Sequence, residues 1–495
     1  MHLSLKEIAD KLQVKYILTH SFLIKDDGFD LWCKLENIET GVALFSNKIS
    51  EPIDMATQMV GKLANDIVTS LKIKTKQDVM KAPTANIEAY EYYLKAKHKY
   101  DKRESEEDIE LVKGLLKKSI ELDDNLLSAK QLLGWVFYHT GNVDIAKLIF
   151  QNNLKQAEKL DDKRSVAEYF GSLATYYADR ADYDIALEYV EKSIEIYEEI
   201  GDLWGFSGRL NTMGIIYHYK GESNKSLAYW KKTQQIYKQL DIQDGMILGN
   251  LGNAYANLGK LDKALDYYTR SLKYYEDKGD KMHSAGRINC IGIVYNQKGN
   301  YDKALEYNNR SLKMRKEIND THGLGYDYFH IGNDYYFKGE LNKALNYFNL
   351  SYNKFEEINK RRDMYSVLSH IGYVYYDKLN YNKAQEYLEK SLELKKELGL
   401  SKKSLLGTTA CLYLVNNSLG KENNLKEIND LINASSYIEF QVNLHLYQLL
   451  EDTSYLQTAY NQIQEKADNL EPDVAAKFLS YPIPKAIVEE WEKVK

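Results

Sequence analysis

The chain has 495 residues, of which 44% are hydrophobic and 28% charged, and it contains only 5 prolines, a composition typical of a long, mostly helical soluble protein. Its formal net charge is −6, with both signs mixed along the chain, so the sequence carries no basic footprint for nucleic acid and no apolar run long enough to cross a bilayer. The first residues lack the apolar core of a secretory signal, and the 3 cysteines are far apart, which predicts a cytoplasmic protein without disulfides.

The first 80 residues are predicted to form a small α/β segment. Strands are expected where apolar and polar residues alternate, with a hairpin turn at Asp26-Asp27-Gly28; their ranges are 14–25, 29–38 and 42–46. Helices are expected over 5–12 and 55–71, the second because Met59, Leu63, Ile67 and Leu71 recur every four residues. Such a thin layer leaves a sheet edge open, through which a second copy of the chain could pair.

Short motifs in this segment resemble the second half of a TolB-like domain. The matching stretches are 8–12, 14–18, 33–37 and 40–41, although the Gly-Ser that usually follows the first strand is replaced by Thr19-His20-Ser21. In proteins of that kind, this domain and a repeat array follow an adenylate or guanylate cyclase, a kinase or a winged-helix domain. The resemblance implies that the chain is similar to the C-terminal region of a bacterial cyclase-type signalling protein, with the effector outside this sequence.

A 40-residue repeat organises the middle of the chain. Gly252, Gly292, Gly332 and Gly372 are 40 residues apart, and each is followed three residues later by a tyrosine. A second block containing alanine and a large apolar residue follows each glycine, and both blocks have helical spacing. The pattern therefore predicts helical hairpins that bury their apolar faces by stacking on their neighbours. We expect Gly259, Gly299 and Gly339 to end first helices, and Asn300 and Asn380 to cap second helices.

These blocks resemble the tetratricopeptide repeat, in a longer form than the standard unit. The resemblance covers about residues 86–400, in about eight units. It implies a mainly α superhelical solenoid of helical hairpins, preceded by the small α/β segment. The predicted domains are a partial TolB-like domain at 1–80, the solenoid at 81–400, and degenerate repeats with a C-terminal helical cap at 401–495.

After residue 400 the repeat weakens but helical patterns continue. Helices are expected over 405–418 and 425–432, with Gly420 as the turn, and over 437–450 and 454–470. Terminal units of solenoids are atypical because they shield the last apolar face. The alternative is a specialised contact with a partner.

The sequence contains no recognisable catalytic constellation. Its 10 histidines are scattered, and no metal-ligand spacing, phosphate-binding loop or nucleophile elbow is present. The repeated glycines belong to packed helices and are not phosphate cradles. We therefore expect no enzyme activity and no cofactor.

The resemblance implies a binding groove lined by the first helices of successive repeats. Asparagine suits such a groove because its amide both donates and accepts hydrogen bonds, and tyrosine adds apolar contact with a polar tip. The residues carried over to the groove are Asn211, Asn250, Asn253, Asn289, Asn296, His330, Asn333, Tyr336, His370, Tyr373 and Tyr376. For each of them the alternative is a role in capping, solvation or packing. The lysine–asparagine clamp for a C-terminal carboxylate is absent, since the matching positions hold Gly249/Asn253, Asn289/Ile293 and Phe329/Asn333.

Three functions remain open at this point. The first is a non-catalytic scaffold that holds a protein or peptide partner in the groove, in bacterial signalling. The second is the regulatory part of a cyclase, and the third is a peptide-sensing regulator of transcription or signalling. The sequence names neither the partner nor the effector.

Overall fold

The computed structural model describes residues 16–24, 28–37, 42–52, 84, 86–101, 103, 105–240, 242–400, 402–435 and 437–495. They belong to two compact units, Met1–Gln243 and Asp244–Lys495. This division lies inside the repeat array, so the domain boundaries at 80/81 and 400/401 remain predictions.

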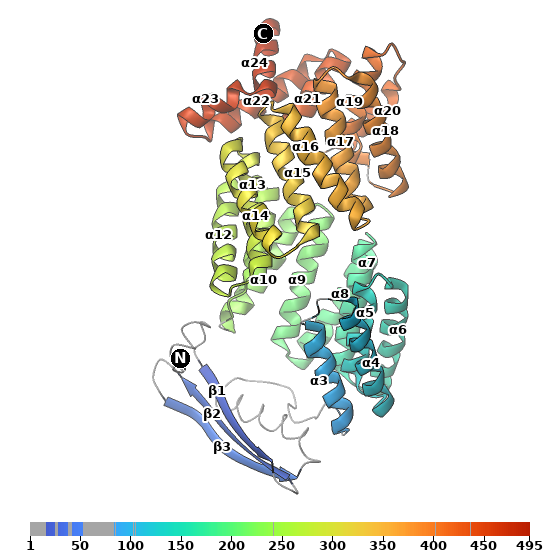
Figure 1. The fold of residues 1–495 in the computed structure, drawn as a ribbon, viewed down its shortest axis with the longest axis vertical. Helices are drawn as coiled ribbons and strands as arrows, with labels where there is room; N and C mark the ends of the chain where they lie inside the picture. The colour runs from blue at the N-terminus through green and yellow to red at the C-terminus, as the bar shows by residue number, and fades with distance from the viewer. Residues whose placement is uncertain are drawn as a thin grey trace. The chain divides into compact units, whose positions relative to one another are not determined.

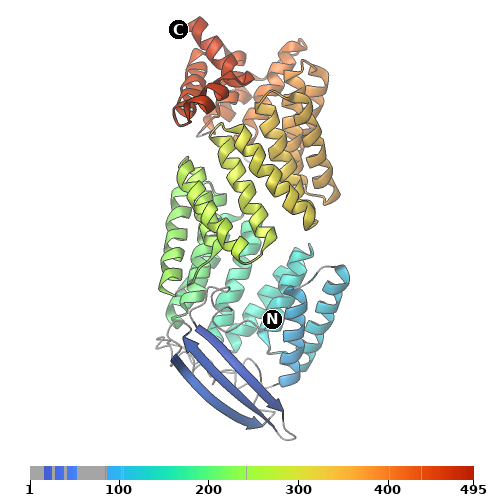
Figure 2. The same ribbon diagram turned by 60° about the vertical axis from the view of Figure 1, so that its left-hand side comes forward.

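The first unit contains a three-stranded antiparallel sheet in the order β1-β2-β3 (Figures 1 and 2). Its strands are β1 (Tyr16–Ile24), β2 (Gly28–Asn37) and β3 (Val42–Pro52), so the third strand is longer than the alternation at 42–46 indicates. Leu31, Cys33 and Leu35 on β2 are buried, as expected for one apolar face. The helices expected over 5–12 and 55–71 lie outside the described residues.

The other described elements of both units are helices. In the first unit they are α3 (Ile87–Asp101), α4 (Glu106–Leu122), α5 (Leu127–His139), α6 (Val143–Lys159), α7 (Lys163–Asp179), α8 (Tyr183–Ile200), α9 (Leu203–Tyr219) and α10 (Ser223–Gln239). In the second unit they are α11 (Gly245–Asn257), α12 (Leu261–Asp277), α13 (Lys281–Gln297), α14 (Tyr301–Glu317), α15 (Thr321–Phe337), α16 (Leu341–Glu357), α17 (Arg361–Asp377), α18 (Tyr381–Glu397), the short η2 (Lys402–Ser404), α19 (Leu406–Ser418), α20 (Leu425–Asn433), α21 (Phe440–Leu450), α22 (Thr453–Asp468), α23 (Pro472–Ser480) and α24 (Pro482–Val494). The predicted mainly α fold of helical hairpins is confirmed.

The hairpins from α5 to α18 each pair an odd-numbered A helix with an even-numbered B helix. The repeated glycine of the A helix packs against a B-helix side chain in every hairpin that carries it. A Cβ at Gly332 would lie 2.7 Å from Phe348 Cδ1, and one at Gly252 would lie 2.6 Å from Tyr268 Cδ1. The glycine therefore sets how closely the two helices approach, as the sequence predicts.

The turns between the two helices also agree with the sequence. Gly259, Gly299 and Gly339 have φ of +69°, +86° and +79°, the left-handed conformation that favours glycine just past a helix end. The side chains of Asn300 and Asn380 accept hydrogen bonds from the backbone N–H of Lys303 and Lys383, which confirms both as N-caps.

The repeated tyrosine of each A helix stacks on a B-helix tyrosine twelve residues later. The ring pairs are Tyr177–Tyr189, Tyr217–Tyr229, Tyr255–Tyr267, Tyr295–Tyr307, Tyr335–Tyr347 and Tyr375–Tyr387, with centroids 5.3 to 5.6 Å apart. Each pair joins the two helices of a hairpin on the side of the turn between them. This stacking gives the recurring tyrosine of the repeat a structural role.

A buried serine hydroxyl on the B helix forms a second link within most of these hairpins. Ser271, Ser311 and Ser351 are fully buried and donate to the backbone carbonyls of Gly245, Ala285 and Gly325, over 2.5, 3.0 and 2.8 Å. Each carbonyl precedes its serine by 26 residues, and Ser193 and Ser391 repeat the contact. The hydroxyl is satisfied without a large side chain, so the helices stay close.

The C-terminal helices fold back onto the preceding hairpins of the second unit. Helices α19 and α20 continue past α18, and α21 to α24 then lie beside the ends of α13 to α16 (Figures 1 and 2). Phe478 of α23 is fully buried against Tyr301 of α14, with ring centroids 6.2 Å apart. Helices α21 and α22 also contact earlier repeats, since Gln441 donates to the Tyr336 hydroxyl and Lys466 donates to the Gln297 carbonyl. No described helix is both long and apolar enough to cross a membrane.

Candidate functional site

A helices contact one another within each unit: α5 contacts α7 and α7 contacts α9 in the first, and α13 contacts α15 and α15 contacts α17 in the second; we call the surface they share the inner face. All eleven predicted groove residues lie on A helices. The structure places Asn211 of α9 in the first unit and the other ten in the second unit. Asn211 and Asn289 are only 8% and 6% exposed. Their side chains are therefore part of the packed interior.

The asparagines of α11 and α13 bond within the protein. Asn253 Oδ1 accepts from the Tyr268 hydroxyl over 2.6 Å, and Asn250 is partly exposed. Asn289 Nδ2 donates to Asn308 Oδ1 over 3.2 Å, and Asn296 Nδ2 donates to Asp334 Oδ1 over 2.6 Å. These amides hold side chains of neighbouring helices in place. Their predicted contact with a peptide remains a prediction.

The aromatic and histidine positions of α15 and α17 face the C-terminal helix α21. Tyr336 is buried, and its hydroxyl accepts from Gln441 Nε2 over 2.6 Å. The His445 ring lies 6.4 Å from Tyr373 and 5.8 Å from Tyr376, measured between centroids. This part of the inner face is covered by the chain's own helix.

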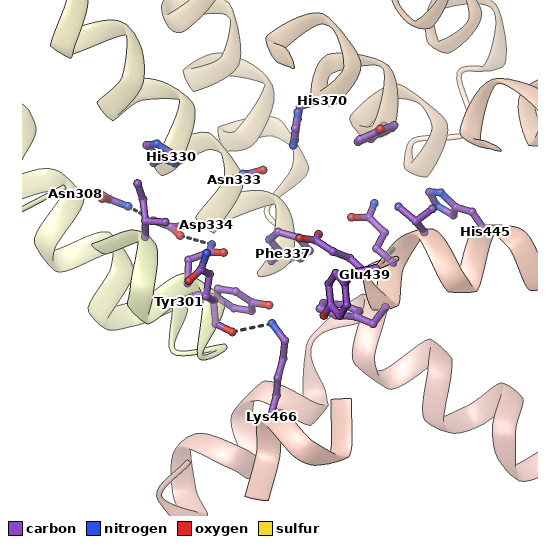
Figure 3. Close-up of a pocket in the computed structure, with 18 residues that line it drawn as sticks. Tyr301, Asn308, His330, Asn333, Asp334, Phe337, His370, Glu439, His445 and Lys466 are labelled. Atoms are coloured by element: carbon purple, nitrogen blue, oxygen red, sulfur yellow. Dashed lines mark hydrogen bonds between the residues drawn. The ribbon is translucent and has the colours of Figure 1, made fainter. Parts of the chain in front are cut away.

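A cavity of about 340 Å³ remains between the A helices and the C-terminal helices (Figure 3), and we call it the covered cavity. Five of the predicted groove residues line it together: Asn296, His330, Asn333, His370 and Tyr373. Tyr336 and Tyr376 lie next to it through their contacts with α21, whereas Asn211, Asn250, Asn253 and Asn289 are not among its lining residues.

Two polar residues that sequence reasoning missed form one wall of the covered cavity. Asn308 and Asp334 are both fully buried, and Asn308 Nδ2 donates to Asp334 Oδ2 over 2.8 Å. Burial raises the pKa of Asp334 to about 8, although the bonds from Asn296 and Asn308 favour its charged form. The sequence does mark this position, because Asn308 stands where other hairpins have the aromatic residues Tyr268 or Phe348.

The histidines around the covered cavity are neutral at pH 7. Burial lowers the pKa of His330, His370 and His445 to about 4. His370 Nδ1 lies 2.7 Å from the Ser366 carbonyl, which can only accept, so Nδ1 carries the proton and Nε2 is an acceptor. His445 Nδ1 is buried and has no hydrogen-bond partner in the protein.

A second hollow, of about 350 Å³, lies in the first unit among α5, α7 and α9, and we call it the arginine hollow. Arg209 Nε is buried there without a hydrogen-bond partner. The Arg209 guanidinium occupies the space beside Gly171, where a Cβ would lie 1.6 Å from Nη1. Trp204 is 54% exposed and stacks on Tyr237 with centroids 5.6 Å apart. Sequence reasoning missed this hollow because it considered only residues beside the repeated glycine, whereas Arg209 precedes Gly214 by five residues and Trp204 by ten.

Charges in the arginine hollow are mixed. Arg164 Nη2 lies 3.1 Å from Asp202 Oδ2, and Arg164 Nε lies 3.8 Å from Glu168 Oε1. Burial raises the pKa of Glu168, and the nearby Arg164 and Arg209 oppose that shift. The hollow therefore offers hydrogen-bond donors, apolar rings and a carboxyl group in one place. No group of three or more His, Cys, Asp or Glu side chains placed to bind a metal occurs among the described residues.

Family models of the tetratricopeptide repeat match residues 166–200, 208–277, 284–357 and 365–398. The chain therefore carries tetratricopeptide repeats, as the sequence predicts. The TolB-like and cyclase-type resemblances are not matched and remain predictions. No curated protein matches the chain.

Several solved structures resemble this chain in fold. NprR in complex with its cognate peptide NprX is 16% identical, with 73% of this chain and 99% of that chain covered and a TM-score of 0.49. Aspartyl phosphate phosphatase F from Bacillus subtilis is 16% identical, with 70% and 92% covered and a TM-score of 0.48. A Signal Transduction ATPase with Numerous Domains from Pyrococcus horikoshii, with a tetratricopeptide repeat sensor, is 18% identical, with 70% and 52% covered and a TM-score of 0.46. The chain thus spans about half the length of that ATPase.

Proposed function

We propose that this tetratricopeptide-repeat chain is a non-catalytic scaffold of bacterial signalling that holds a segment of a partner protein against its A helices. The observation that carries the proposal is the arginine hollow, where Arg209 Nε is buried without an acceptor beside the exposed ring of Trp204. A buried donor without a partner costs roughly 1–3 kcal/mol, and a carbonyl or carboxylate of a bound segment would remove that cost.

The two units differ in what they offer such a partner. In the second unit, α21 already bonds and stacks against Tyr336, Tyr373 and Tyr376. In the first unit, the arginine hollow is lined by residues of α5 and of α7 to α10, and no C-terminal helix lines it. We therefore place the main partner contact on α5, α7 and α9, and we keep Asn250 and Asn253 of α11 as proposed contacts of the second unit.

The chemistry of the arginine hollow indicates the kind of segment. Arg209 suits a carboxylate or a backbone carbonyl, because its guanidinium presents several donors in a fixed plane. Trp204 and Trp135 add apolar surface of the kind that dominates binding energy at protein interfaces. We expect an extended segment with an acidic side chain next to an apolar one.

Selection from a random peptide library displayed on phage, with the full chain as target, tests this proposal. Selected peptides should bind the Arg209→Ala and Trp204→Ala variants at least ten times more weakly in fluorescence anisotropy. Lys192→Ala on α8 and Tyr219→Ala at the end of α9 serve as controls, and both should bind as the wild type does. Equal binding by all variants would refute the assignment, and Asn253→Ala tests α11 in the same assay.

A further inference from the structure

The covered cavity of the second unit has hydrogen-bond acceptors that the fold does not use. Asn333 Oδ1 is buried without a hydrogen-bond partner in the protein, and the Asn333 side chain lines the cavity (Figure 3). His370 Nε2 is an acceptor, since Nδ1 donates to the Ser366 carbonyl. His445 is only 5% exposed and its Nδ1 is also unpartnered. A ligand with N–H donors would satisfy Asn333 Oδ1 and His370 Nε2.

The Asp334 carboxyl group is not paired with a cation among the described residues, and burial favours its protonated form. Asp334 is fully buried and lines the cavity, and none of the ion pairs among described residues includes it. Lys338 is the nearby cation that lowers the pKa of Asp334, but its Nζ pairs with Asp302 over 2.9 Å. A buried carboxyl group without a counter-ion is costly, and a bound cation would stabilise its charged form.

Other charged groups of the covered cavity do not supply that cation. Lys466 Nζ donates to the Gln297 carbonyl over 2.7 Å and stands 5.1 Å from the Phe440 ring centroid. Glu439 is a second carboxylate among the lining residues. The walls therefore hold two carboxyl groups and one engaged ammonium group.

Aromatic rings complete the walls of the covered cavity. Phe337 and Phe440 lie with ring centroids 6.1 Å apart, and Tyr373 and Tyr437 line the cavity as well. Tyr437 is 68% exposed, so one wall is at the protein surface. The faces of aromatic rings attract organic cations, most strongly where water is excluded. A volume of about 340 Å³ is in the range of small-molecule sites.

We propose that the covered cavity binds a small organic cation with N–H donors, an ammonium or guanidinium compound, whose charged group lies against Asp334, Asn333 and His370. This site belongs to the second unit and does not depend on the proposed partner contact in the arginine hollow. It would give the scaffold a metabolite site built jointly by the repeats and the C-terminal helices.

Isothermal titration calorimetry of the full chain with agmatine, which carries a guanidinium and an ammonium group, tests the proposal. We expect saturable binding to one site. N-butylurea, which has N–H donors without charge, and choline, which has charge without N–H donors, should each bind at least ten times more weakly. Absence of agmatine binding at millimolar concentration, or choline binding as tight as agmatine, would overturn the proposal.

Variants then locate the site. Asp334→Asn should weaken agmatine binding at least tenfold. Asp266→Asn is the control, because Asp266 is an exposed carboxyl group on α12 that does not line the cavity. Asn333→Ala should also weaken binding, whereas Asn253→Ala, at the equivalent position of α11, should not. Wild-type affinity in folded Asp334→Asn and Asn333→Ala would place agmatine elsewhere and refute the assignment.

Discussion

Asn308 Nδ2 of α14 donates a hydrogen bond to Asp334 Oδ2 of α15 over 2.8 Å, whereas the equivalent positions 40 residues later hold the buried apolar side chains of Phe348 and Val374. The contact between these two successive hairpins is thus polar where the next such contact along the chain is apolar. Because a buried polar pair is less stabilising than close apolar packing, its presence is most simply explained by the covered cavity that it lines.

The stability of Asp334→Asn relative to the wild type should depend on pH. Burial raises the pKa of Asp334 from 3.8 to about 8 in the folded protein. Between these values the unfolded chain binds fewer protons than the folded chain, so the Asp334 contribution to the free energy of unfolding falls as pH rises. Asparagine does not titrate, so the melting temperature of Asp334→Asn should rise relative to wild type from pH 5 to pH 8.

Differential scanning calorimetry at several pH values measures this difference. The neutral histidines are present in both proteins, so their own titration cancels in the comparison. Asp266→Asn on the exposed surface of α12 is the control, and its difference from wild type should stay flat. A flat difference for Asp334→Asn would mean that its carboxyl group titrates near its ordinary pKa.

Gly292→Leu should lower the melting temperature. A Cβ at Gly292 would lie 2.2 Å from Asn308 Oδ1, and Asn308 cannot withdraw because Asn289 and Asp334 hold its amide. Overpacking of this kind costs roughly 1–3 kcal/mol. Gly286→Ala on the same helix is the control: nothing lies within 4 Å of the added Cβ, so stability should stay equal or rise by up to about 1 kcal/mol. An unchanged melt of Gly292→Leu would contradict the close contact.

Periodicity was sufficient to predict the hairpins. The glycine and tyrosine spacing places each pair of helices, and the turn glycines and asparagine caps fix most helix ends within a few residues. The buried serines were overlooked because a serine on a helix is common and its partner carbonyl is a backbone atom that no sequence pattern marks. The third strand extends to Pro52, beyond the alternation that predicts it.

The functional site was harder to predict from the sequence than the helical hairpins were. Residues beside the repeated glycine do lie on A helices, but α21 covers several of them, as the bond from Gln441 to Tyr336 shows. That contact joins residues 105 positions apart. No repeat pattern continues to α21, so the sequence alone did not indicate where this helix would dock. Arg209 was missed although Arg287 stands at the equivalent position, five residues before its repeated glycine, because the other repeats hold different residues there.

Arg315→Met should strongly destabilise the second unit at pH 8. Arg315 Nε lies 3.3 Å from Asp327 Oδ2, and the two side chains are 9% and 0% exposed. Removal of one partner of a buried ion pair typically costs about 3–5 kcal/mol, because the other charge stays buried without compensation. The double variant Arg315→Met/Asp327→Asn should recover much of this loss in urea unfolding. Equal loss in the single and double variants would show that Arg315 acts through packing only.

Phe478→Ala should loosen the C-terminal helices from the repeats. Phe478 is fully buried against Tyr301 and against Gly299, where an added Cβ would lie 2.7 Å from its ring. A phenylalanine-to-alanine change in a core costs about 3–5 kcal/mol, and the loss should concentrate where the ring packs. Amide hydrogen exchange should therefore accelerate in α21 to α24 and at the ends of α13 and α15, while α18 stays unchanged. Val494→Ala, at a side chain 41% exposed, is the control and should leave exchange as in the wild type. Helix α21 covers Tyr336 and Tyr373. If exchange accelerates only in α23, then α21 and α22 keep their place over these tyrosines without help from Phe478.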